Sequence, residues 1–220
     1  MSTKIIVALD YTNPLDALEM TAKLRDVVDG FKINHCLWSQ SVYIKDYTKD
    51  KELFMDLKLW DTPNTVNQVL QKIIDKGCTM TTICTHNNAS VFEAVQPFSK
   101  YVKLLAVTYL TSWTAEDRHD ITNTSRNLMW RNHLDRISPY GFSGIICSAS
   151  DIENIANLEK HYIKVCPGIQ YETENTGQSR TTTPRKAKEL GADYLVIGRS
   201  ITQASDPVQT VNEIRESLNG

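Results

Sequence analysis

Short apolar runs rich in β-branched residues recur along the whole chain, and a segment with helical periodicity follows most of them. Each run is continuously hydrophobic rather than alternating, as is typical of parallel strands that are buried on both faces. The runs predict strands at Lys4–Asp10, Phe31–Asn34, Leu53–Leu59, Met80–His86, Lys103–Leu110, Gly144–Ala149, Ile163–Ile169 and Tyr194–Ile201.

The segments between these runs predict amphipathic helices. From Pro63 to Gly77 the apolar residues fall on one stripe, with Thr62 placed to cap the helix and Gly77 to end it. The last helix opens at Pro207, and its apolar residues also share one face.

Eight strands, each followed by a helix, within 220 residues is the pattern of an α/β protein with a (β/α)8 TIM barrel near the short end of its size range. A doubly wound open sheet also alternates strand and helix, but it usually has about five or six strands. The chain has neither a GxGxxG step after a strand nor a GxxxxGK[ST] loop. Because no linker divides it, we expect residues 1–220 to form one barrel domain.

Composition and charge exclude several classes of protein. With 24 Lys and Arg against 26 Asp and Glu, the net charge is −2, so no basic field exists to attract nucleic acid. The longest apolar run, Ile5–Leu9, falls far short of the ~18 residues of a membrane span. No signal peptide precedes it, and the five cysteines include no CxxC pair, which favours reduced thiols. We therefore expect a cytoplasmic protein with neither a nucleic-acid nor a membrane partner.

Polar residues lie near the carboxyl ends of almost all the predicted strands. A buried strand tolerates charge poorly unless the charge is paired, and in a parallel barrel these ends converge on one mouth. The polar residues at the ends are Asp10, Lys32, Asp56, Lys58, His86, Thr111, Ser148 and the Gly198-Arg199 step. Their convergence predicts a functional site at the mouth.

The segment DLKLWD, residues 56–61, concentrates this charge. Strand alternation points Asp56 and Lys58 the same way, ~7 Å apart, and the leucines between them the other way. With Lys32 from the neighbouring strand and Asp61 beyond the strand end, a Lys-Asp-Lys-Asp set of alternating sign results, which keeps the lysines protonated and the aspartates ionised. A protonated lysine held between carboxylates could serve as a general acid that donates its proton from a fixed position. The alternative, a purely structural ion network, would add little net stability.

The Gly198-Arg199 step at the end of the eighth strand suggests a phosphate site. Glycine lets a backbone amide approach an anion, and the arginine guanidinium can donate two parallel hydrogen bonds to it. The alternative is an arginine that only covers the edge of the barrel mouth. The polar segment from Gln170 to Thr183, which contains Gln178, follows a strand and is long for a barrel loop, so it also favours a phosphorylated ligand.

Residues 56–65, DLKLWDTPNT, resemble the signature D-x-K-x-x-D-[IT]-P-x-T of the orotidine 5′-monophosphate decarboxylase family, in its bacterial type. Further matches follow along nearly the whole chain and in the expected order: VALD at 7–10, FK at 31–32, VTYLTS at 107–112, CSA at 147–149, PGI at 167–169, GQ at 177–178, VIGRSIT at 196–202 and DP at 206–207.

The resemblance implies the loss of CO2 from orotidine 5′-monophosphate to give uridine 5′-monophosphate, the last step of de novo pyrimidine nucleotide synthesis, with no metal and no organic cofactor. It implies that Lys58 stabilises and protonates a carbanion at pyrimidine C6, while Asp56 lies against the substrate carboxylate. It also implies that Asp10 and Lys32 hold the ribose hydroxyls.

The same resemblance assigns the remaining residues. Asp61 and Thr65 would reach the active site of a neighbouring subunit, so a homodimer with shared sites is implied. Thr111 would contact the pyrimidine. The other expected substrate contacts, several of them to phosphate, are Pro167, Gln170, Gln178, Gly198 and Arg199. Two positions depart from the usual bacterial pattern, Gln170 in place of Arg and Asn34 in place of Gly, and we expect both to affect affinity rather than chemistry.

Two alternatives stay open. Keto-gulonate phosphate decarboxylase and hexulose phosphate synthase, Mg2+-dependent enzymes of the same superfamily, are similar in their D-x-K-x-x-D motif. They carry an acidic residue in the second strand, where this chain has Phe31-Lys32-Ile33-Asn34. A non-catalytic binder of phosphorylated ligands is the second alternative, which the complete charged set disfavours.

Overall fold

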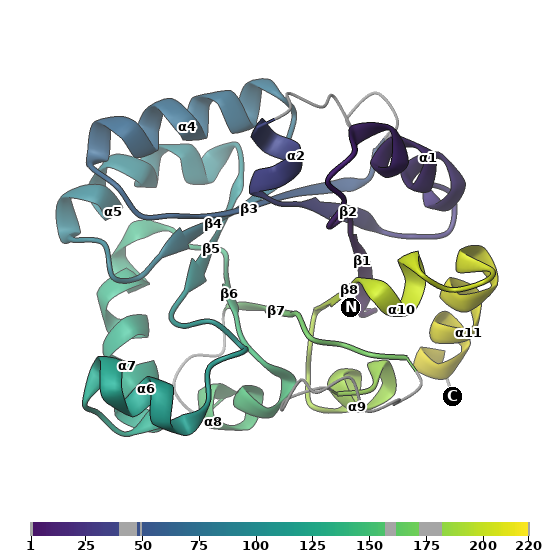
Figure 1. Ribbon diagram of the computed structural model, residues 1–220. Helices are drawn as coiled ribbons and strands as arrows, with labels where there is room; N and C mark the ends of the chain where they lie inside the picture. The colour runs from purple at the N-terminus through teal and green to yellow at the C-terminus, as the bar shows by residue number, and fades with distance from the viewer. Residues whose placement is uncertain (1, 40–47, 49, 157–161, 172–181, 220) are drawn as a thin grey trace.

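The computed structural model describes residues 2–39, 48, 50–156, 162–171 and 182–219. Within these ranges, eight parallel strands pair in chain order and close into a barrel, which confirms the predicted (β/α)8 architecture (Figure 1). The strands are β1 Lys4–Ala8, β2 Gly30–Ile33, β3 Glu52–Leu59, β4 Met80–Cys84, β5 Lys103–Val107, β6 Gly144–Ile146, β7 Ile163–Cys166 and β8 Tyr194–Ile197.

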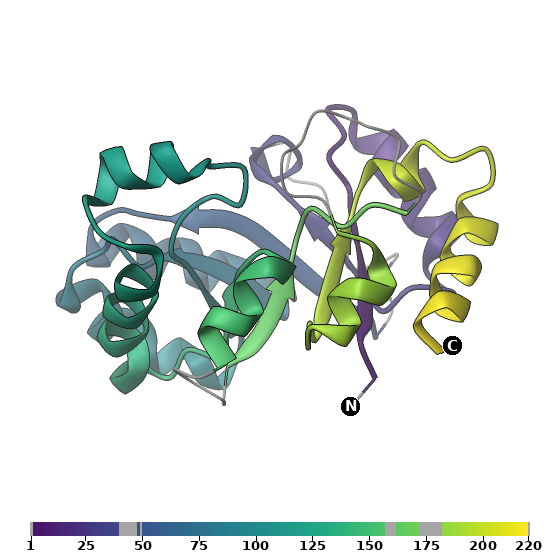
Figure 2. The same ribbon diagram turned by 90° about the horizontal axis from the view of Figure 1, so that it is seen from below.

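Helices surround the strands on the outside of the barrel, and Figure 2 shows the same arrangement from the side, with the N-terminus at the amino end of β1. The helices are α1 Pro14–Leu24, α2 His35–Ser39, α4 Pro63–Asp75, α5 Ala89–Val95, α6 Ala115–Thr122, α7 Arg126–Ile137, α8 Ile152–Ala156, α9 Pro184–Glu189, α10 Arg199–Thr202 and α11 Pro207–Asn219. Short 3-10 turns lie at Gln96–Lys100, Ser138–Tyr140 and Ala149–Asp151. None of the helices in the described ranges is both long and apolar enough to span a membrane.

Most strands begin within one residue of the predicted start but end earlier than predicted. The clearest case is β8, which ends at Ile197, because Gly198 leaves the extended conformation and α10 begins at Arg199. The prediction of a strand as far as Ile201 is wrong: Ile201 belongs to α10 and is fully buried. The apolar run itself ends at Ile197, because Gly198, Arg199 and Ser200 follow it, and Ile201 is buried as part of the helix.

The helix predicted from Pro63 is confirmed as α4, with Thr62 at the N-cap position and Gly77 in the left-handed region just beyond its end (φ 70°). The Thr62 side chain makes no capping bond, however. Its hydroxyl pairs with that of Thr65 at 3.1 Å. The stability of this helix therefore comes from its buried apolar stripe rather than from a side-chain cap.

Two layers of apolar side chains hold the fold together. The larger layer lies between the strands and the helices, and the smaller one fills the barrel with residues such as Phe54, Met80 and Val165. At the amino end, the Glu52 carboxylate closes the barrel: it accepts hydrogen bonds from Lys103 (2.5 Å), from the Tyr194 hydroxyl (3.1 Å) and from the hydroxyl of Thr79, the residue just before β4. The interior is thus occupied at the amino end and through the middle, which leaves the carboxyl end for a site.

Candidate active site

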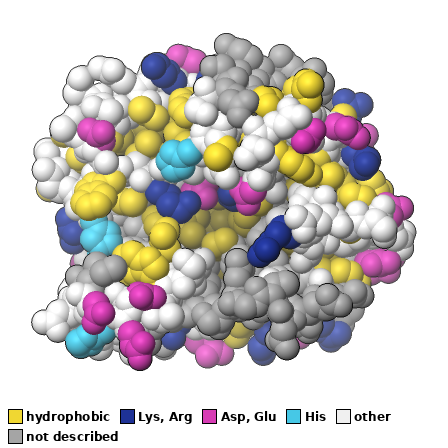
Figure 3. All heavy atoms as spheres, in the orientation of Figure 1, with side chains coloured by type: hydrophobic (Ala, Val, Ile, Leu, Met, Phe, Trp, Pro, Cys, Tyr) yellow, Lys and Arg dark blue, Asp and Glu magenta, His cyan; other side chains and the backbone are white. Residues whose placement is uncertain are grey.

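A cavity of ≈ 410 Å³ opens at the carboxyl end of the barrel. Figure 3 shows it as a hollow with an apolar floor and charged side chains along one edge. Residues from β1, β2, β3 and β5 to β8, or from the loops directly after them, line it. Its size is in the range of small-molecule sites, and its place agrees with the convergence predicted from the strand ends.

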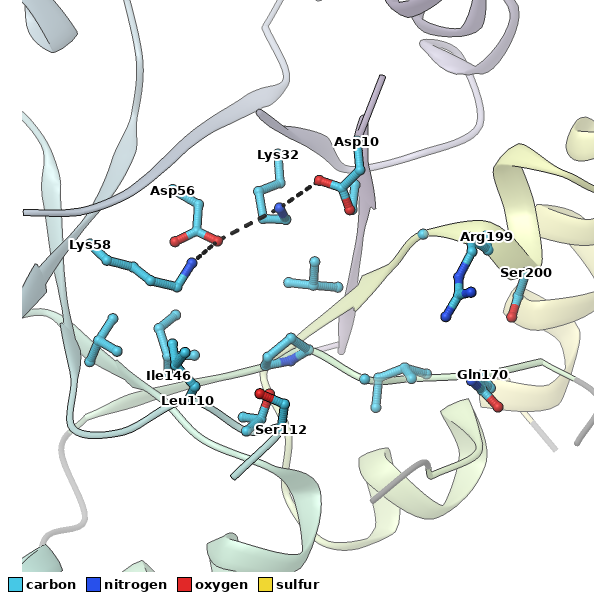
Figure 4. A pocket seen from close by; sticks show the side chains of 18 of the residues that line it. Asp10, Lys32, Asp56, Lys58, Leu110, Ser112, Ile146, Gln170, Arg199 and Ser200 are labelled. Atoms are coloured by element: carbon cyan, nitrogen blue, oxygen red, sulfur yellow. Dashed lines mark hydrogen bonds and ion pairs between the residues drawn. The ribbon is translucent and has the colours of Figure 1, made fainter. Parts of the chain in front are cut away.

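Four charged side chains form a continuous line along one wall (Figure 4). The Lys32 Nζ lies 3.2 Å from Asp10 Oδ1 and 3.6 Å from Asp56 Oδ2, and Asp56 Oδ2 lies 2.9 Å from Lys58 Nζ. The two inner members, Lys32 and Asp56, have side chains only 11% and 14% exposed, whereas Asp10 and Lys58 at the ends are 56% and 36% exposed. The buried centre orients the two ends, and both ends are accessible to a ligand.

The charge of Asp56 is fixed by its neighbours. Burial alone would raise the pKa of this carboxyl, but the charges of Lys32 and Lys58, with hydrogen bonds from Lys58 and Thr82, outweigh burial and hold the pKa below its usual value. Asp56 is therefore ionised at neutral pH. Its negative charge is held 2.9 Å from the Lys58 Nζ.

The backbone at Lys58 departs from a regular strand. Its φ is 49°, in the left-handed region, and the register between β3 and β4 shifts between Met55 and Leu59. A non-glycine residue in this region costs about 1–2 kcal/mol, and such conformations cluster at functional sites. The Lys58 N–H donates to the Thr82 hydroxyl (2.8 Å) instead of a ladder carbonyl. The bulge therefore aims Lys58 into the cavity.

Two polar side chains that the sequence reasoning missed support this line of charges. The fully buried Thr82 hydroxyl accepts from Lys58 N and donates to Asp56 Oδ1 (3.0 Å), so it fixes both residues at once. The Asn34 amide donates to Asp10 Oδ1 (2.9 Å), while its carbonyl accepts from Cys36 N (3.0 Å). Asn34 was noticed only as a departure from a pattern, and Thr82 reads in the sequence as an ordinary strand residue.

Arg199, Ser200 and Gln170 lie at the opposite side of the cavity from Lys58 (Figure 4). Ser200 was not predicted. Pro167 and Gly198 line the cavity as well. A Cβ at Gly198 would meet its nearest neighbour, Ala8, at an ordinary 3.7 Å, so this glycine is not required by packing within the chain. A side chain at this position would project into space next to the cavity, close to Ala8 and Asp10.

The remaining predicted residues separate into three groups. Thr111 lines the cavity from the segment after β5. Asp61 and Thr65 are exposed and are not among the residues that line it; the Asp61 carboxylate accepts from Thr62 N at 2.6 Å. The four-membered line thus runs through Asp10, and Asp61 is not part of it. Gln178 lies outside the described residues.

Ser148, expected at the mouth, points elsewhere. Its hydroxyl donates to the buried carboxylate of Asp151 at 2.5 Å, and it is not one of the cavity residues. His86 likewise lies in a separate depression, with its ring 5.0 Å from that of His133. Strand-end position alone therefore did not distinguish side chains that face the cavity from those that face the surrounding layer.

A sequence model described as the orotidine 5′-phosphate decarboxylase / HUMPS family matches residues 3–214. The chain belongs to this family. The orotidine 5′-phosphate decarboxylase of Ehrlichia canis is 37% identical over 171 residues, which cover 76% of this chain and 75% of that protein. The orotidine 5′-phosphate decarboxylase of Dictyoglomus thermophilum is 35% identical over 232 residues, with 97% and 94% covered.

The fold supports the same membership. The crystal structure of orotidine 5′-phosphate decarboxylase from Lactobacillus acidophilus matches with a TM-score of 0.82 at 28% identity, covering 99% of this chain and 100% of that chain. The resemblance read from residues 56–65 to the orotidine 5′-phosphate decarboxylase family is therefore confirmed over nearly the whole length.

Proposed function

We propose that this protein decarboxylates orotidine 5′-monophosphate to uridine 5′-monophosphate without a metal or an organic cofactor. The observation that carries the proposal is the alternating line Asp10–Lys32–Asp56–Lys58 in a cavity whose far side presents Arg199. Family membership makes the chain an enzyme, and relatives named orotidine 5′-phosphate decarboxylase are carboxy-lyases.

Lys58 is the acid of the proposed reaction. The bond between pyrimidine C6 and the carboxyl carbon breaks, CO2 leaves, and the electron pair stays on C6. The Lys58 ammonium stabilises this developing negative charge and then gives C6 a proton, which solvent replaces on the lysine. Asp56, ionised and 2.9 Å from Lys58, would lie against the substrate carboxylate and disfavour the charged ground state relative to the product.

The other residues of the cavity would bind the ribose, the pyrimidine and the phosphate of the substrate. Asp10, the most exposed member of the line, suits the ribose hydroxyls together with Lys32. Thr111 would contact the pyrimidine. The residues expected at the phosphate are Arg199, the Gly198 backbone, Gln170 and Gln178, with Pro167 beside them. Binding energy from the phosphate would be used to position the base over Lys58.

We also propose a cytoplasmic homodimer with shared active sites. Asp61 and Thr65 do not line the cavity of their own chain, although both belong to the matched motif and are exposed. The neighbouring Trp60 is 72% exposed, so this face presents a large apolar side chain that a partner could cover. A second copy of the chain on this face would cover Trp60 and bring Asp61 to its partner's cavity.

The Mg2+-dependent alternatives are disfavoured by the partners of the carboxylates. Asp10 and Asp56, which would have to coordinate a metal at this wall, are each bonded to lysine ammonium groups. An ammonium competes with a cation for the same oxygens, so a metal here would have to displace Lys32.

The experiment that tests the proposal follows the ultraviolet absorbance of orotidine 5′-monophosphate with the purified protein and excess EDTA. We expect rapid loss of substrate, with uridine 5′-monophosphate as the product. No loss with EDTA, together with turnover of a sugar phosphate in Mg2+, would assign the protein to the alternative branch of the family. If neither substrate is converted, the remaining interpretation is a protein that binds phosphorylated ligands without catalysing a reaction.

A further inference from the structure

A buried carboxylate outside the catalytic line gathers donors from three parts of the chain. The Asp151 side chain is 1% exposed. It accepts from the Tyr109 hydroxyl (2.8 Å), from Arg126 Nε (2.6 Å), from the Ser148 hydroxyl (2.5 Å) and from the Trp130 indole (3.4 Å). Burial would raise the pKa of Asp151, but these partners outweigh it and lower the pKa.

The donors tie the end of β5 to the start of α7 and to the end of β6. Tyr109 is the member that connects Asp151 to the cavity, because Tyr109 itself and the next three residues, Leu110–Ser112, line it. The other end of this segment is held by Trp113, whose ring stacks on Tyr109 with centroids 6.4 Å apart and planes 24° apart. The Trp113 N–H also donates to the Leu110 carbonyl at 3.0 Å. The cavity-lining turn is therefore clamped at both ends through one tyrosine.

We propose that Asp151 is a positioning residue for the reaction: through Tyr109 it holds the Leu110–Ser112 turn in the conformation that receives the pyrimidine of the substrate. The inference rests on the proposed function, which places Thr111 of this turn at the pyrimidine. Asp151 does not contact the substrate. It acts by keeping the receptive conformation of the turn populated.

The negative charge of Asp151 explains why an aspartate is suited to hold the Leu110–Ser112 turn. A hydrogen bond to an ionised acceptor is stronger than one between neutral groups, and Arg126 compensates the buried charge. Apparent affinity falls in proportion to the fraction of protein in the binding-competent conformation. Loss of the Tyr109 bond should therefore weaken substrate binding while leaving the chemistry at Lys58 unchanged.

Tyr109→Phe tests this inference, because it removes the hydroxyl that donates to Asp151 and keeps the ring, its stacking and its place in the cavity wall. The matched control is Tyr194→Phe, which removes a tyrosine hydroxyl bonded to the Glu52 carboxylate (3.1 Å) at the amino end of the barrel. Both tyrosines are almost fully buried, at 4% and 6% exposed, so the two variants should lose similar amounts of stability and differ in their effect on the cavity. Asp151→Asn, at a residue that is not among those lining the cavity, is the second variant.

We expect Tyr109→Phe to raise KM about tenfold with kcat nearly unchanged, and Asp151→Asn to do the same or more. Tyr194→Phe should leave both constants at the wild-type values. Hydrogen exchange should become faster at the amides of Leu110–Trp113 in Tyr109→Phe and remain slow in Tyr194→Phe.

Other results would overturn the inference. Wild-type KM and wild-type exchange in Tyr109→Phe would show that the bond does not order the turn. A fall in kcat at constant KM would place the effect in the chemical step instead. Failure of the proposed function would look different, since the wild-type protein itself would not convert orotidine 5′-monophosphate; the exchange comparison would then still decide whether Asp151 orders the turn.

Discussion

At the scale of single residues, Lys58 combines a side chain that lines the cavity with an unfavourable backbone conformation. Its left-handed φ of 49° comes with the shift in register between β3 and β4 and with the bond from its N–H to Thr82. A regular strand would avoid this cost of about 1–2 kcal/mol. The conformation persists because Asp56, Thr82 and the barrel wall hold it, and its result is an ammonium group aimed into the cavity.

Replacement of Lys58 by alanine and by glycine separates function from strain. Both variants should lose at least about a thousandfold in kcat, because the proton donor and the charge opposite Asp56 are gone. Lys58→Gly should nevertheless be about 1 kcal/mol more stable than Lys58→Ala, since glycine adopts a positive φ without strain. Urea unfolding of the pair measures the difference. Equal stabilities would argue against strain, and substantial kcat in either variant would remove Lys58 from its role.

Arg199 should contribute to binding rather than to chemistry. Arg199→Ala removes the guanidinium expected at the phosphate, so KM should rise about 10- to 100-fold, with a smaller fall in kcat if the binding energy also orders the site. Steady-state kinetics on orotidine 5′-monophosphate measure both constants, and Arg185→Ala, on the exposed face of α9, is the matched control. An unchanged kcat/KM would mean that the phosphate lies elsewhere.

The sequence indicated the charged residues Asp10, Lys32, Asp56 and Lys58, but not the local geometry that joins them. Regular strand alternation predicts Asp56 and Lys58 on one face, and strand order predicts the neighbouring charge of Lys32. The side chains of Asp56 and Lys58 do meet, but across a shift in register rather than along a regular strand. The bulge at Lys58 could not be predicted, because a shift in register leaves no mark in a run of apolar and charged residues. Thr82 was missed because a threonine in a strand is ordinary.

At the scale of elements, parallel strands approach one another closely at the amino end of the barrel. A Cβ on Gly144, the first residue of β6, would lie 2.5 Å from the Ile163 carbonyl oxygen of β7 and 2.9 Å from a Leu105 methyl group. The first contact is with backbone, which cannot rotate away. Glycine here is a requirement of packing between β5, β6 and β7.

Gly144→Ala should therefore destabilise the protein by about 1–3 kcal/mol, the usual cost of overpacking. The folded fraction should keep its kcat and KM, because the residue lies at the opposite end of β6 from the cavity. Denaturant unfolding and kinetics on the same preparations give both quantities, with Ser143→Ala as the control one residue away. A variant as stable as the wild type would contradict the close approach of the strands.

Element boundaries were less predictable than element types. Apolar runs marked where strands begin, since a strand enters the core at its first buried residue. They did not mark where strands end, because residues such as Ile201 and Ile169 stay buried after the ladder stops. Ser148 bonds to Asp151 in a local capping box at residues 148–151, which the expectation of a mouth residue overlooked. The bond from Tyr109 to the same carboxylate spans 42 residues, and no local pattern records it.

At the scale of the whole molecule, one buried histidine should make stability depend on pH. His133 is 8% exposed, its Nδ1 makes no hydrogen bond within the described residues, and its ring faces His86 and Arg136. Burial, with the nearby His86 and Arg136, lowers the pKa of His133 to about 4. In the unfolded chain the histidine pKa is near ~6.5, so between pH ~6.5 and ~4 the unfolded state binds a proton at His133 and the folded state does not. The free energy of unfolding therefore falls as the pH drops through this range.

From about pH 7 to about pH 5 this difference should remove about 2 kcal/mol of unfolding free energy. Urea unfolding at the two pH values measures the loss for the wild type and for His133→Leu, in which the loss should be smaller by that amount. His35→Gln, at an exposed histidine, should retain the wild-type dependence. The same loss in His133→Leu as in the wild type would assign the effect to other groups.

The proposed shared sites predict that two inactive variants restore each other. In a mixed dimer of Lys58→Ala and Asp61→Ala chains, the cavity of the Asp61→Ala chain keeps its own Lys58 and receives Asp61 from its partner, while the other cavity lacks both. Random reassortment at equal concentrations makes about half of the dimers mixed, each with one intact site, so activity should return to about a quarter of the wild-type value. Each variant reassorted with itself is the control and should stay inactive. If Asp61 acts within its own chain, no mixed dimer contains an intact site and the mixture will remain inactive.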